Sequence, residues 1–317
     1  MRMSHVRKSF AAGAAMFSLV SAVESLGADS APPAPMPRFQ TFRIGSYTGI
    51  ALNDGALRMP NDGKSFVVGR SPAEVAKVLT SGGAPGEYLE FDVQPLLVRT
   101  DRSVLLFDTG AGNYFGPITG ELLKSMAAAG MPPAGVTDIF ISHAHGDHVG
   151  GLVTGTGALA FPNATIHMSA PEWAWLSTMT ADEAKKFGMP DVTALVAAIR
   201  SKVVPFQPGA TLIPDLVTAV EIKGHTPGHS GYQIGSGADS VLYIGDSMHS
   251  YVISVRKPSW KVEFDQDQQA GAASRTALVK RVAASGQRVY AVHFPFPGIG
   301  KIVEQKGMYV WVPEVFR

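Results

Sequence analysis

Short runs of β-branched and aromatic residues alternate along the chain with segments whose apolar residues recur every three or four positions. The first pattern predicts strands and the second predicts helices. The predicted strands cover residues 39–44, 47–52, 95–99, 104–107, 138–142, 216–222, 232–234, 240–244 and 288–292. The predicted helices cover residues 72–79, 117–129, 171–179, 181–187, 192–202 and 272–284. Strands that alternate with helices in this way are typical of an α/β protein.

The composition agrees with one large globular domain. The 317 residues can enclose a sizeable hydrophobic core, and only 17% of them are charged. The net charge of +1 gives no electrostatic reason to expect a nucleic acid or a membrane surface as partner. The chain contains no cysteine, so any metal site must use nitrogen and oxygen ligands.

The N-terminal segment has the three parts of an export signal. Arg2, Arg7 and Lys8 precede an apolar run of small residues that ends at Val23, and the small residues Gly27 and Ala28 then offer a cleavage point. We therefore expect residues 1–28 to be a secretory signal peptide and the protein to be periplasmic or secreted. The apolar run is shorter than the about 20 residues that a transmembrane helix needs, so an uncleaved membrane anchor is the less favoured alternative.

Cleavage after residue 28 divides the rest of the chain into two parts. Residues 29–38 are rich in proline and are expected to form an extended linker. Residues 39–317 are expected to form a single domain. The cleaved chain keeps 24 basic and 25 acidic residues, so the slight positive charge belongs to the leader.

Four potential metal ligands lie within six positions directly after the predicted strand 138–142. The segment reads His143-Ala144-His145-Gly146-Asp147-His148. Imidazole and carboxylate groups together suit zinc and similar divalent ions. A loop at the end of a strand holds such ligands in place and leaves one side of the site open. The weaker interpretation is a polar surface loop that contains three of the chain's nine histidines by chance.

Three later segments place histidine or aspartate at or just beyond predicted strands. The turn at residues 224–230 contains His225 and His229, and Asp246 and His293 each follow a strand. Open α/β sheets gather their ligands at the C-terminal ends of strands, so we expect these segments to meet the first cluster.

Together these motifs resemble the metallo-β-lactamase fold superfamily, over the chain from about residue 39 to the end. Within the superfamily the chain is most similar to methyl parathion hydrolase and its lactonase and arylesterase relatives. The stretches that carry this similarity are 107–110, 115–117, 159–164 and above all 293–300. The resemblance implies a four-layer αββα sandwich with two metal ions at one edge of the two sheets.

The resemblance also implies a ligand set. The implied ligands are His143, His145 and His229 for the first ion, Asp147, His148 and His293 for the second, and Asp246 as a bridge between both. His225 is then expected to be a structural turn residue. The ions are expected to be Zn²⁺, although Mn²⁺, Co²⁺ and Fe²⁺ can use the same ligands. Two such ions share a hydroxide whose pKa they lower, which makes Asp246 and Asp147 the candidate catalytic residues, with Asp147 as a hypothetical proton donor to the leaving group.

Other residues receive roles in the substrate pocket and around the ligands. Phe115 and Trp175 match positions that line the pocket of methyl parathion hydrolase, where they would favour aryl or other apolar groups. Packing in the core is the alternative for Trp175. Asp108 is expected either to hydrogen-bond a ligand histidine from behind or to be an ordinary turn residue. His249 lies near Asp246 in the chain and is expected at most to support the ligands.

The expected function is that of a secreted dinuclear-metal hydrolase. Its metal-bridging hydroxide would cleave small lactones, aryl esters or phosphotriesters such as methyl parathion. A β-lactamase is the first alternative, although such enzymes lack an aspartate at the position of Asp246. A nuclease of the same superfamily is the second alternative, and a non-enzymatic protein that holds metal ions is the last. The expected partner is a small molecule and not a nucleic acid, with no stable membrane anchor, and relatives of this kind form homodimers.

Overall fold

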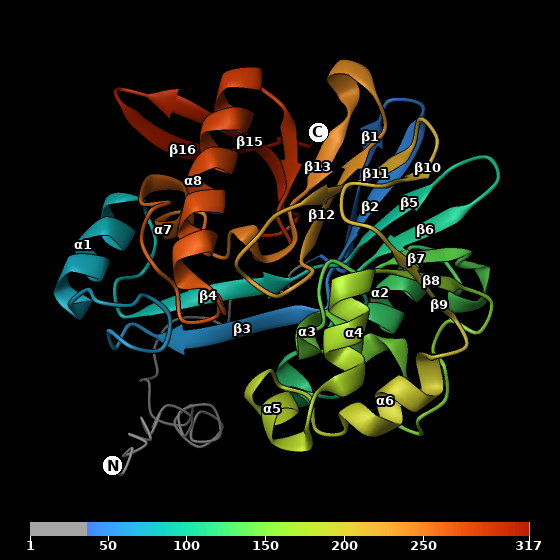
Figure 1. Ribbon diagram of the computed structural model, residues 1–317. Coiled ribbons are helices and arrows are strands. Elements are labelled where there is room, and N and C mark those ends of the chain that lie inside the picture. The colour runs from blue at the N-terminus through green and yellow to red at the C-terminus, as the bar shows by residue number, and fades with distance from the viewer. Residues whose placement is uncertain (1–36, 317) are drawn as a thin grey trace, which may run out of the picture. The chain divides into compact units, whose positions relative to one another are not determined.

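Two seven-stranded sheets face each other in the computed structural model, which describes residues 37–316 (Figure 1). The first sheet has the order β1 (Phe39–Ile44), β2 (Tyr47–Leu52), β5 (Leu96–Arg99), β6 (Val104–Phe107), β7 (Asp138–Phe140), β8 (Thr165–Ser169) and β9 (Val203–Phe206). The second has the order β10 (Thr211–Ile213), β11 (Val217–Glu221), β12 (Ser230–Ile234), β13 (Val241–Tyr243), β14 (Arg288–Tyr290), β15 (Ile299–Gln305) and β16 (Met308–Pro313). The expected signal peptide and all but the last two residues of the expected linker lie outside the described residues.

The core between the sheets follows from the alternation of side chains along each strand. Leu105 and Phe107 of β6 point toward the second sheet, where they join a cluster with Tyr232 and Tyr243. Leu106 points the other way, into the cluster beneath the helices. Successive residues of a strand face opposite sides, so a strand that is apolar throughout is buried on both faces.

Helices cover the outer face of each sheet and complete the expected four-layer αββα sandwich. Over the first sheet lie α2 (Leu122–Ala128), α4 (Ala170–Thr178) and α6 (Val192–Ile199), whose apolar residues share one cluster with that sheet. Over the second sheet lies α8 (Gln268–Ser285), through Leu278, Val279 and Val282. Figure 1 shows these helices on opposite sides of the paired sheets.

The remaining elements lie between or beside the layers. The strands β3 (Gly55–Pro60) and β4 (Tyr88–Val93) form a separate antiparallel pair, against which α1 (Pro72–Ser81) packs. The other helices are α3 (Gly146–Val149), α5 (Ala181–Lys186) and α7 (Ile253–Arg256), with single 3₁₀ turns at Gly116–Ile118, Pro133–Gly135, Gly150–Leu152, Gly237–Asp239 and Gly245–Ser247. Among residues 37–316, no helix has the length and apolar character needed to cross a membrane.

Two predicted helices differ from the observed ones at their N-terminal ends. The helix predicted over 117–129 begins only at Leu122, because Gly120 has a φ of +87°, which no helix accommodates. The helix predicted over 272–284 begins earlier, at Gln268, where the side chain of Asp267 accepts hydrogen bonds from two backbone N–H groups of the first turn. The predictions for β1, β2 and the β5–β6 hairpin are confirmed within one residue.

The strand order brings the polar ends of several strands to one edge of the sandwich. In the first sheet β6, β7 and β8 run parallel, and in the second β13 and β14 run parallel. Asp108, His143, Asp246 and His293 all follow the C-terminal ends of these strands within a few residues. Parallel strands end together, so segments that are 185 positions apart at their extremes meet at the same edge.

Candidate metal centre

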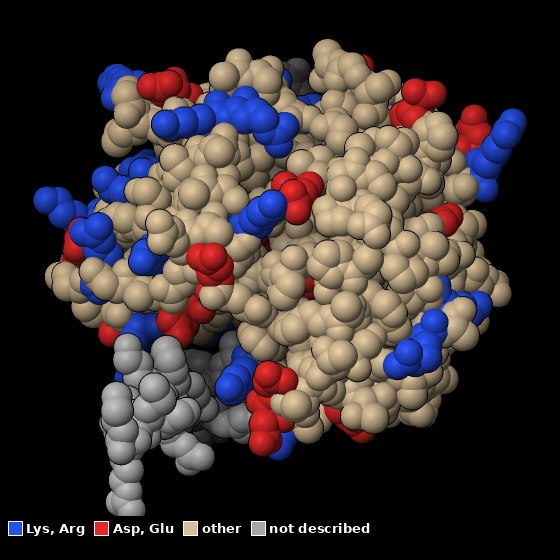
Figure 2. Space-filling view, in the orientation of Figure 1, with Lys and Arg blue, Asp and Glu red and all other residues tan. Residues whose placement is uncertain are grey.

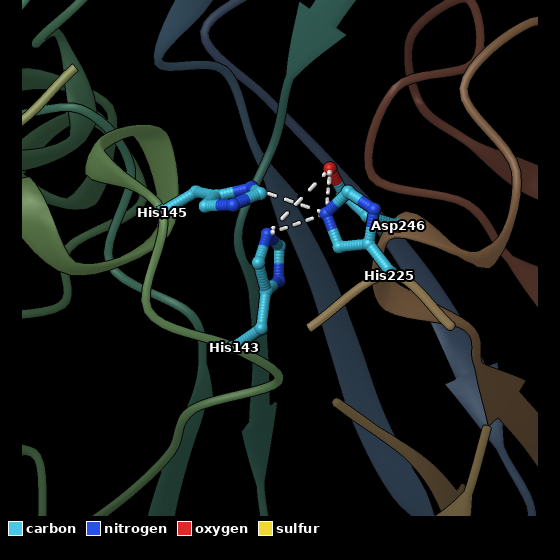
Figure 3. A group of neighbouring side chains, drawn as sticks. All are labelled: His143, His145, His225 and Asp246. Carbon is cyan, nitrogen blue, oxygen red and sulfur yellow. Dashed lines mark hydrogen bonds and ion pairs between the residues drawn. The ribbon is translucent and has the colours of Figure 1, made fainter. Parts of the chain in front are cut away.

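Three histidines and one aspartate converge at this edge. His143, His145, His225 and Asp246 point toward one another from three separate loops (Figure 3). The Nε2 atom of His225 lies 3.1 Å from Nε2 of His143 and 3.1 Å from Nδ1 of His145. It also lies 3.4 Å from Oδ2 of Asp246. We call this group the first cluster.

A second cluster lies on the other side of Asp246. It consists of Asp147, His148 and His293. The Oδ1 atom of Asp246 lies 3.1 Å from Nε2 of His148 and 3.0 Å from Nε2 of His293. Oδ2 of Asp147 lies 3.6 and 3.5 Å from the same two nitrogens. One carboxylate oxygen of Asp246 therefore faces each cluster, which is the arrangement a bridging carboxylate requires.

The backbone brings Asp246 between the clusters through a residue that only glycine suits. Gly245 has a φ of +49°, and a Cβ there would overlap the ring of His229 and crowd Ser142. Glycine tolerates both the left-handed conformation and the close approach. The second sheet can consequently present Asp246 directly against the loop that follows β7.

Hydrogen bonds on the far side of the rings of His148, His293 and His225 fix which nitrogen of each faces the site. His148 donates from Nδ1 to Oδ2 of Asp108 over 2.7 Å, and His293 donates from Nδ1 to the carbonyl oxygen of Asp92 over 2.7 Å. In its neutral form imidazole has one N–H, and these acceptors hold that N–H at Nδ1, so the neutral ring would present the lone pair of Nε2 to the site. The first cluster follows the same rule at His225, whose Nδ1 lies 3.2 Å from Oδ1 of Asp265.

The donor set therefore fits divalent cations. Lone pairs of imidazole and oxygens of two carboxylates meet in a buried space, where they repel one another unless a positive charge lies between them. Within residues 37–316, buried Nε2 of His148 and Oδ1 of Asp246 have no hydrogen-bond partner. The residues present are the nitrogen and oxygen ligands that zinc and similar ions bind.

Burial and neighbouring charges set the pKa values of the rings. Burial, followed by the charge of His148, lowers the pKa of His143 well below its ordinary value. Burial, followed by His225, does the same to the pKa of His145. Both rings are thus neutral at physiological pH, which is the form that binds a metal ion.

The structure differs from the prediction at His229. Its Nε2 accepts a 2.9 Å hydrogen bond from the backbone N–H of Asp246, and its Nδ1 lies 3.1 Å from the carbonyl oxygen of Ile222. Both ring nitrogens are occupied by the backbone, and burial lowers the pKa of His229 to about 3. The first histidine of the turn, His225, takes the place in the first cluster that was predicted for the second.

Asp108 supports the second cluster from behind. Its Oδ2 accepts hydrogen bonds from His148, from the hydroxyl of Ser142 at 2.6 Å and from the hydroxyl of Tyr243 at 2.6 Å. Its Oδ1 accepts from the backbone N–H of Ser142 at 2.7 Å. Asp108 has a φ of +57°, a conformation that aspartate tolerates better than most residues. The side chain thus ties both sheets to one metal-facing histidine.

Glu172 joins two of the three loops of the first cluster, those that carry His143 and His225, and was missed in the sequence. Its carboxylate accepts hydrogen bonds from the backbone N–H of Ala144, the backbone N–H of Gly228 and the hydroxyl of Thr226, each at 2.8 Å. Burial raises the pKa of Glu172 to about 6. A glutamate in the first turn of a helix is common, so nothing in the sequence indicated this role.

Aromatic side chains form a wall beside His145. Phe187 stacks on the imidazole with ring centroids 4.8 Å apart, and Trp175 meets Phe187 edge-on at 5.2 Å. Phe115 lies against Gly188, the residue after Phe187. The wall thus includes both aromatic residues predicted for the pocket. Phe187 was missed, because one apolar residue at the end of the polar helix α5 carries no distinctive pattern.

His249 also lies closer to the site than its sequence context indicated. Its Nε2 is 3.0 Å from Oδ2 of Asp246, and the ring is buried against Phe66, Phe91 and Phe264. It forms a third group with Asp246 and His293 that could hold an ion. The recognisable signal was the i, i+3 spacing from Asp246.

Comparison with known proteins agrees with this fold. Residues 90–283 match the family described as the Metallo-beta-lactamase superfamily, and the chain belongs to that family. It is a metal-dependent hydrolase of the metallo-β-lactamase fold.

Two solved structures are similar over nearly their whole length. AidC, a dizinc quorum-quenching lactonase solved with its product N-hexanoyl-L-homoserine, is 30% identical with a TM-score of 0.80, over 88% of this chain and 98% of that one. The hydrolase AbOPH of the beta lactamase superfamily is 26% identical with a TM-score of 0.78, over 90% of this chain and 100% of that one. Among curated proteins, ribonuclease Z of Pyrococcus furiosus is 34% identical over 85 residues, which are 26% of this chain, and the match spans 25% of its length.

Proposed function

We propose that the protein is a dinuclear metal hydrolase that cleaves small lactones or aryl esters, with phosphotriesters such as methyl parathion as further substrates. The observation that carries this proposal is the position of Asp246, whose two oxygens face two separate groups of ligands. The similarity to a dizinc lactonase over 88% of the chain supports both the pair of ions and the class of substrate. The resemblance of residues 293–300 to methyl parathion hydrolase is the reason for including phosphotriesters in the proposal.

Each of the two clusters would bind one metal ion. His143, His145 and His225 would hold one ion, Asp147, His148 and His293 the other, and Asp246 both. Two divalent ions, when bound, polarise a C=O or P=O group and lower the pKa of water to near neutral. The preference is for Zn²⁺, with Mn²⁺, Co²⁺ and Fe²⁺ able to use the same ligands.

The protein itself orients the substrate and handles the proton. Phe115, Trp175 and Phe187 supply an apolar wall beside the first cluster, against which an acyl chain or an aryl leaving group can pack. Asp147 is more exposed than Asp246, with 13% against 4% of the side chain accessible, so it lies where a leaving group would depart. We assign to Asp147 the transfer of a proton from the attacking water to that group.

Charge on the surface favours a small substrate over a polyanion. In Figure 2 the surface around α4 carries few charged residues, whereas Lys and Arg gather over α1 and α8 with Asp and Glu among them. A nuclease needs a continuous basic track along its substrate, and its binding is strongly dependent on salt. The match to ribonuclease Z covers only 26% of this chain and is no evidence for such a basic track.

A substrate panel tests the proposal. The metal-free protein would be supplied in turn with Zn²⁺, Mn²⁺ and Co²⁺ and assayed with an acyl-homoserine lactone, dihydrocoumarin, a p-nitrophenyl ester, methyl parathion and a chromogenic cephalosporin. We expect turnover of a lactone or aryl ester that requires metal and is lost in Asp246→Asn. Hydrolysis of the cephalosporin alone, or full turnover without metal, would contradict the proposal.

Two further expectations accompany this function. We propose that the protein acts after export, because residues 1–28 have the pattern of a signal peptide, and that it forms a homodimer. Fractionation of cells that express the full chain tests the first, with recovery in the cytoplasm as the contrary result. Light scattering of the purified protein tests the second, with a mass near 33.5 kDa or less as the contrary result.

A further inference from the structure

Asp265 and Arg275 form a buried ion pair directly behind His225. Oδ1 of Asp265 lies 3.2 Å from Nδ1 of His225, and Oδ2 of Asp265 accepts a 3.1 Å hydrogen bond from the guanidinium of Arg275. Both charged side chains are 1% exposed. A carboxylate and a guanidinium are seldom buried this completely, and removal of one partner leaves the other charge uncompensated. Nothing in the sequence pattern indicated this pair.

The guanidinium of Arg275 is held by backbone carbonyl groups as well. It donates to the carbonyl oxygens of Pro258 at 3.1 Å, Trp260 at 3.0 Å and Ser247 at 3.3 Å. Ser247 directly follows Asp246, the residue that faces both clusters. Arg275 therefore links the segment that carries Asp246 to the carboxylate that holds His225.

The backbone around His225 is fixed by the same part of the chain. The carbonyl oxygen of His225 accepts a hydrogen bond from Gln266 at 3.1 Å, and that of Gly224 accepts one from Asp267 at 2.9 Å. Gly271, one turn before Arg275 on α8, lies so close to Asp265 that a Cβ there would overlap its carboxylate. A glycine inside a helix costs about 1 kcal/mol relative to alanine, and here it makes room for the carboxylate.

We propose that Asp265, held by Arg275, is a positioning residue that fixes the ring and the tautomer of His225 and thereby sets the metal affinity of the first cluster. A carboxylate that accepts the Nδ1–H of an imidazole keeps the lone pair on Nε2 and makes that nitrogen a stronger ligand. Nε2 of His225 lies 3.1 Å from the facing nitrogens of both His143 and His145, so rotation or a change of tautomer would open the cluster.

The charge on Asp265 agrees with this role. Burial by itself would raise the pKa of Asp265. The hydrogen bond from His225 and the charge of Arg275 outweigh this effect, so the pKa of Asp265 lies below its ordinary value. The carboxylate is therefore ionised and acts as an acceptor only. The inference rests on the proposed function, because it requires His225 to bind one of the two ions.

Metal affinity is the first readout. Competition with a chelator would give the affinity of each of two Zn²⁺ ions for the wild type and for Asp265→Asn, which conserves shape. We expect the affinity of one ion to fall about 10- to 100-fold and that of the other to change little, because loss of a partner behind a ligand histidine has this effect. Asp138→Asn is the matched control, since Asp138 pairs with His167 at 2.9 Å away from both clusters.

The ring nitrogens give a second readout that does not depend on activity. Long-range ¹H–¹⁵N correlation spectra of the metal-free protein report the tautomer of each histidine. We expect the Nδ1–H form of His225 in the wild type and a mixture or the Nε2–H form in Asp265→Asn, with the other histidines unchanged. Arg275→Lys keeps the positive charge but loses the forked guanidinium group that holds Asp265. We expect this variant to lose metal affinity in the same direction by a smaller amount. It tests the positioning role if Asp265→Asn does not fold.

The outcomes separate this inference from the proposed function. If the wild type binds two ions and His225→Ala loses one, but Asp265→Asn and Arg275→Lys bind both as tightly as the wild type, the positioning role is overturned and the proposed function stands. If His225→Ala keeps both ions, the ligand assignment fails and the positioning role fails with it. If metal binding behaves as expected but no lactone or ester is hydrolysed, only the proposed substrate class fails.

Discussion

The Nε2 atom of His229 accepts a 2.9 Å hydrogen bond from the backbone N–H of Asp246. The ring therefore holds the segment that presents Asp246 and has no nitrogen left for a metal ion, since Nδ1 lies 3.1 Å from the carbonyl oxygen of Ile222. His225, four positions earlier, reaches the first cluster instead. Two histidines of one turn thus have different tasks, one toward the metal and one toward the backbone.

The two histidines should respond differently to replacement by alanine. His225→Ala should bind about one divalent ion per chain after dialysis, where the wild type binds two. His229→Ala should keep both ions but lose about 1–3 kcal/mol in the free energy of unfolding, because the buried N–H of Asp246 loses its acceptor. Elemental analysis and denaturant titration measure the two effects. The assignment is wrong if His229→Ala is the variant that loses an ion.

Asp108 should matter to the second cluster through His148. Asp108→Asn should lower the affinity of one ion about 10- to 100-fold, because an amide is a weaker acceptor for the Nδ1–H of the ligand histidine. Asp215→Asn is the control, since Asp215 shares a positive φ, of +59°, and asparagine tolerates that conformation equally well. Chelator competition measures both variants, and equal affinities in the two would count against the role of Asp108.

Asp54 should make stability depend on pH. Its Oδ2 and Oδ1 accept hydrogen bonds from the backbone N–H groups of Ala111 and Leu122, at the two ends of the loop that carries Phe115. Burial raises the pKa of Asp54 from 3.8 to about 7, despite these hydrogen bonds. Between these values the folded state binds a proton that the unfolded state has released.

The contribution of Asp54 to stability is therefore fully present below about pH 3.8 and is lost as the pH rises to about 7. Asp54→Asn cannot release this proton, so the difference in unfolding free energy between wild type and variant should change by up to about 1.4 kcal/mol per pH unit in this range. Denaturant titrations from pH 4 to 8 measure the difference, with exposed Asp101→Asn as control. A difference that does not vary with pH would contradict the raised pKa.

Gly188 should influence substrate selection through Phe115. A Cβ at Gly188 would overlap the ring of Phe115, so Gly188→Ala should displace one side of the aromatic wall. Gly209→Ala is the matched control: its φ of +81° is close to the +72° of Gly188, but nothing lies within 4 Å of its Cβ. Both variants should lose about 1 kcal/mol of stability from the left-handed backbone.

Only Gly188→Ala should raise KM, and it should do so more for long-chain or aryl substrates than for a short-chain ester. Steady-state kinetics on a pair of esters that differ only in the length of the acyl chain measures the ratio. An unchanged ratio would remove Phe115 from the substrate pocket.

The sequence alone identified the parts whose signal is local. Ligand types packed into six positions, a proline after an N-cap serine and the alternation of β1 and β2 each reflect forces that act between near neighbours, and the resemblance then supplied the four layers. Only the tertiary structure decided the choice between His225 and His229, the third aromatic residue of the wall and the pair of Asp265 and Arg275. Each of these depends on which groups from distant segments are buried against one another, because a buried nitrogen or charge takes the partner that folding leaves within reach.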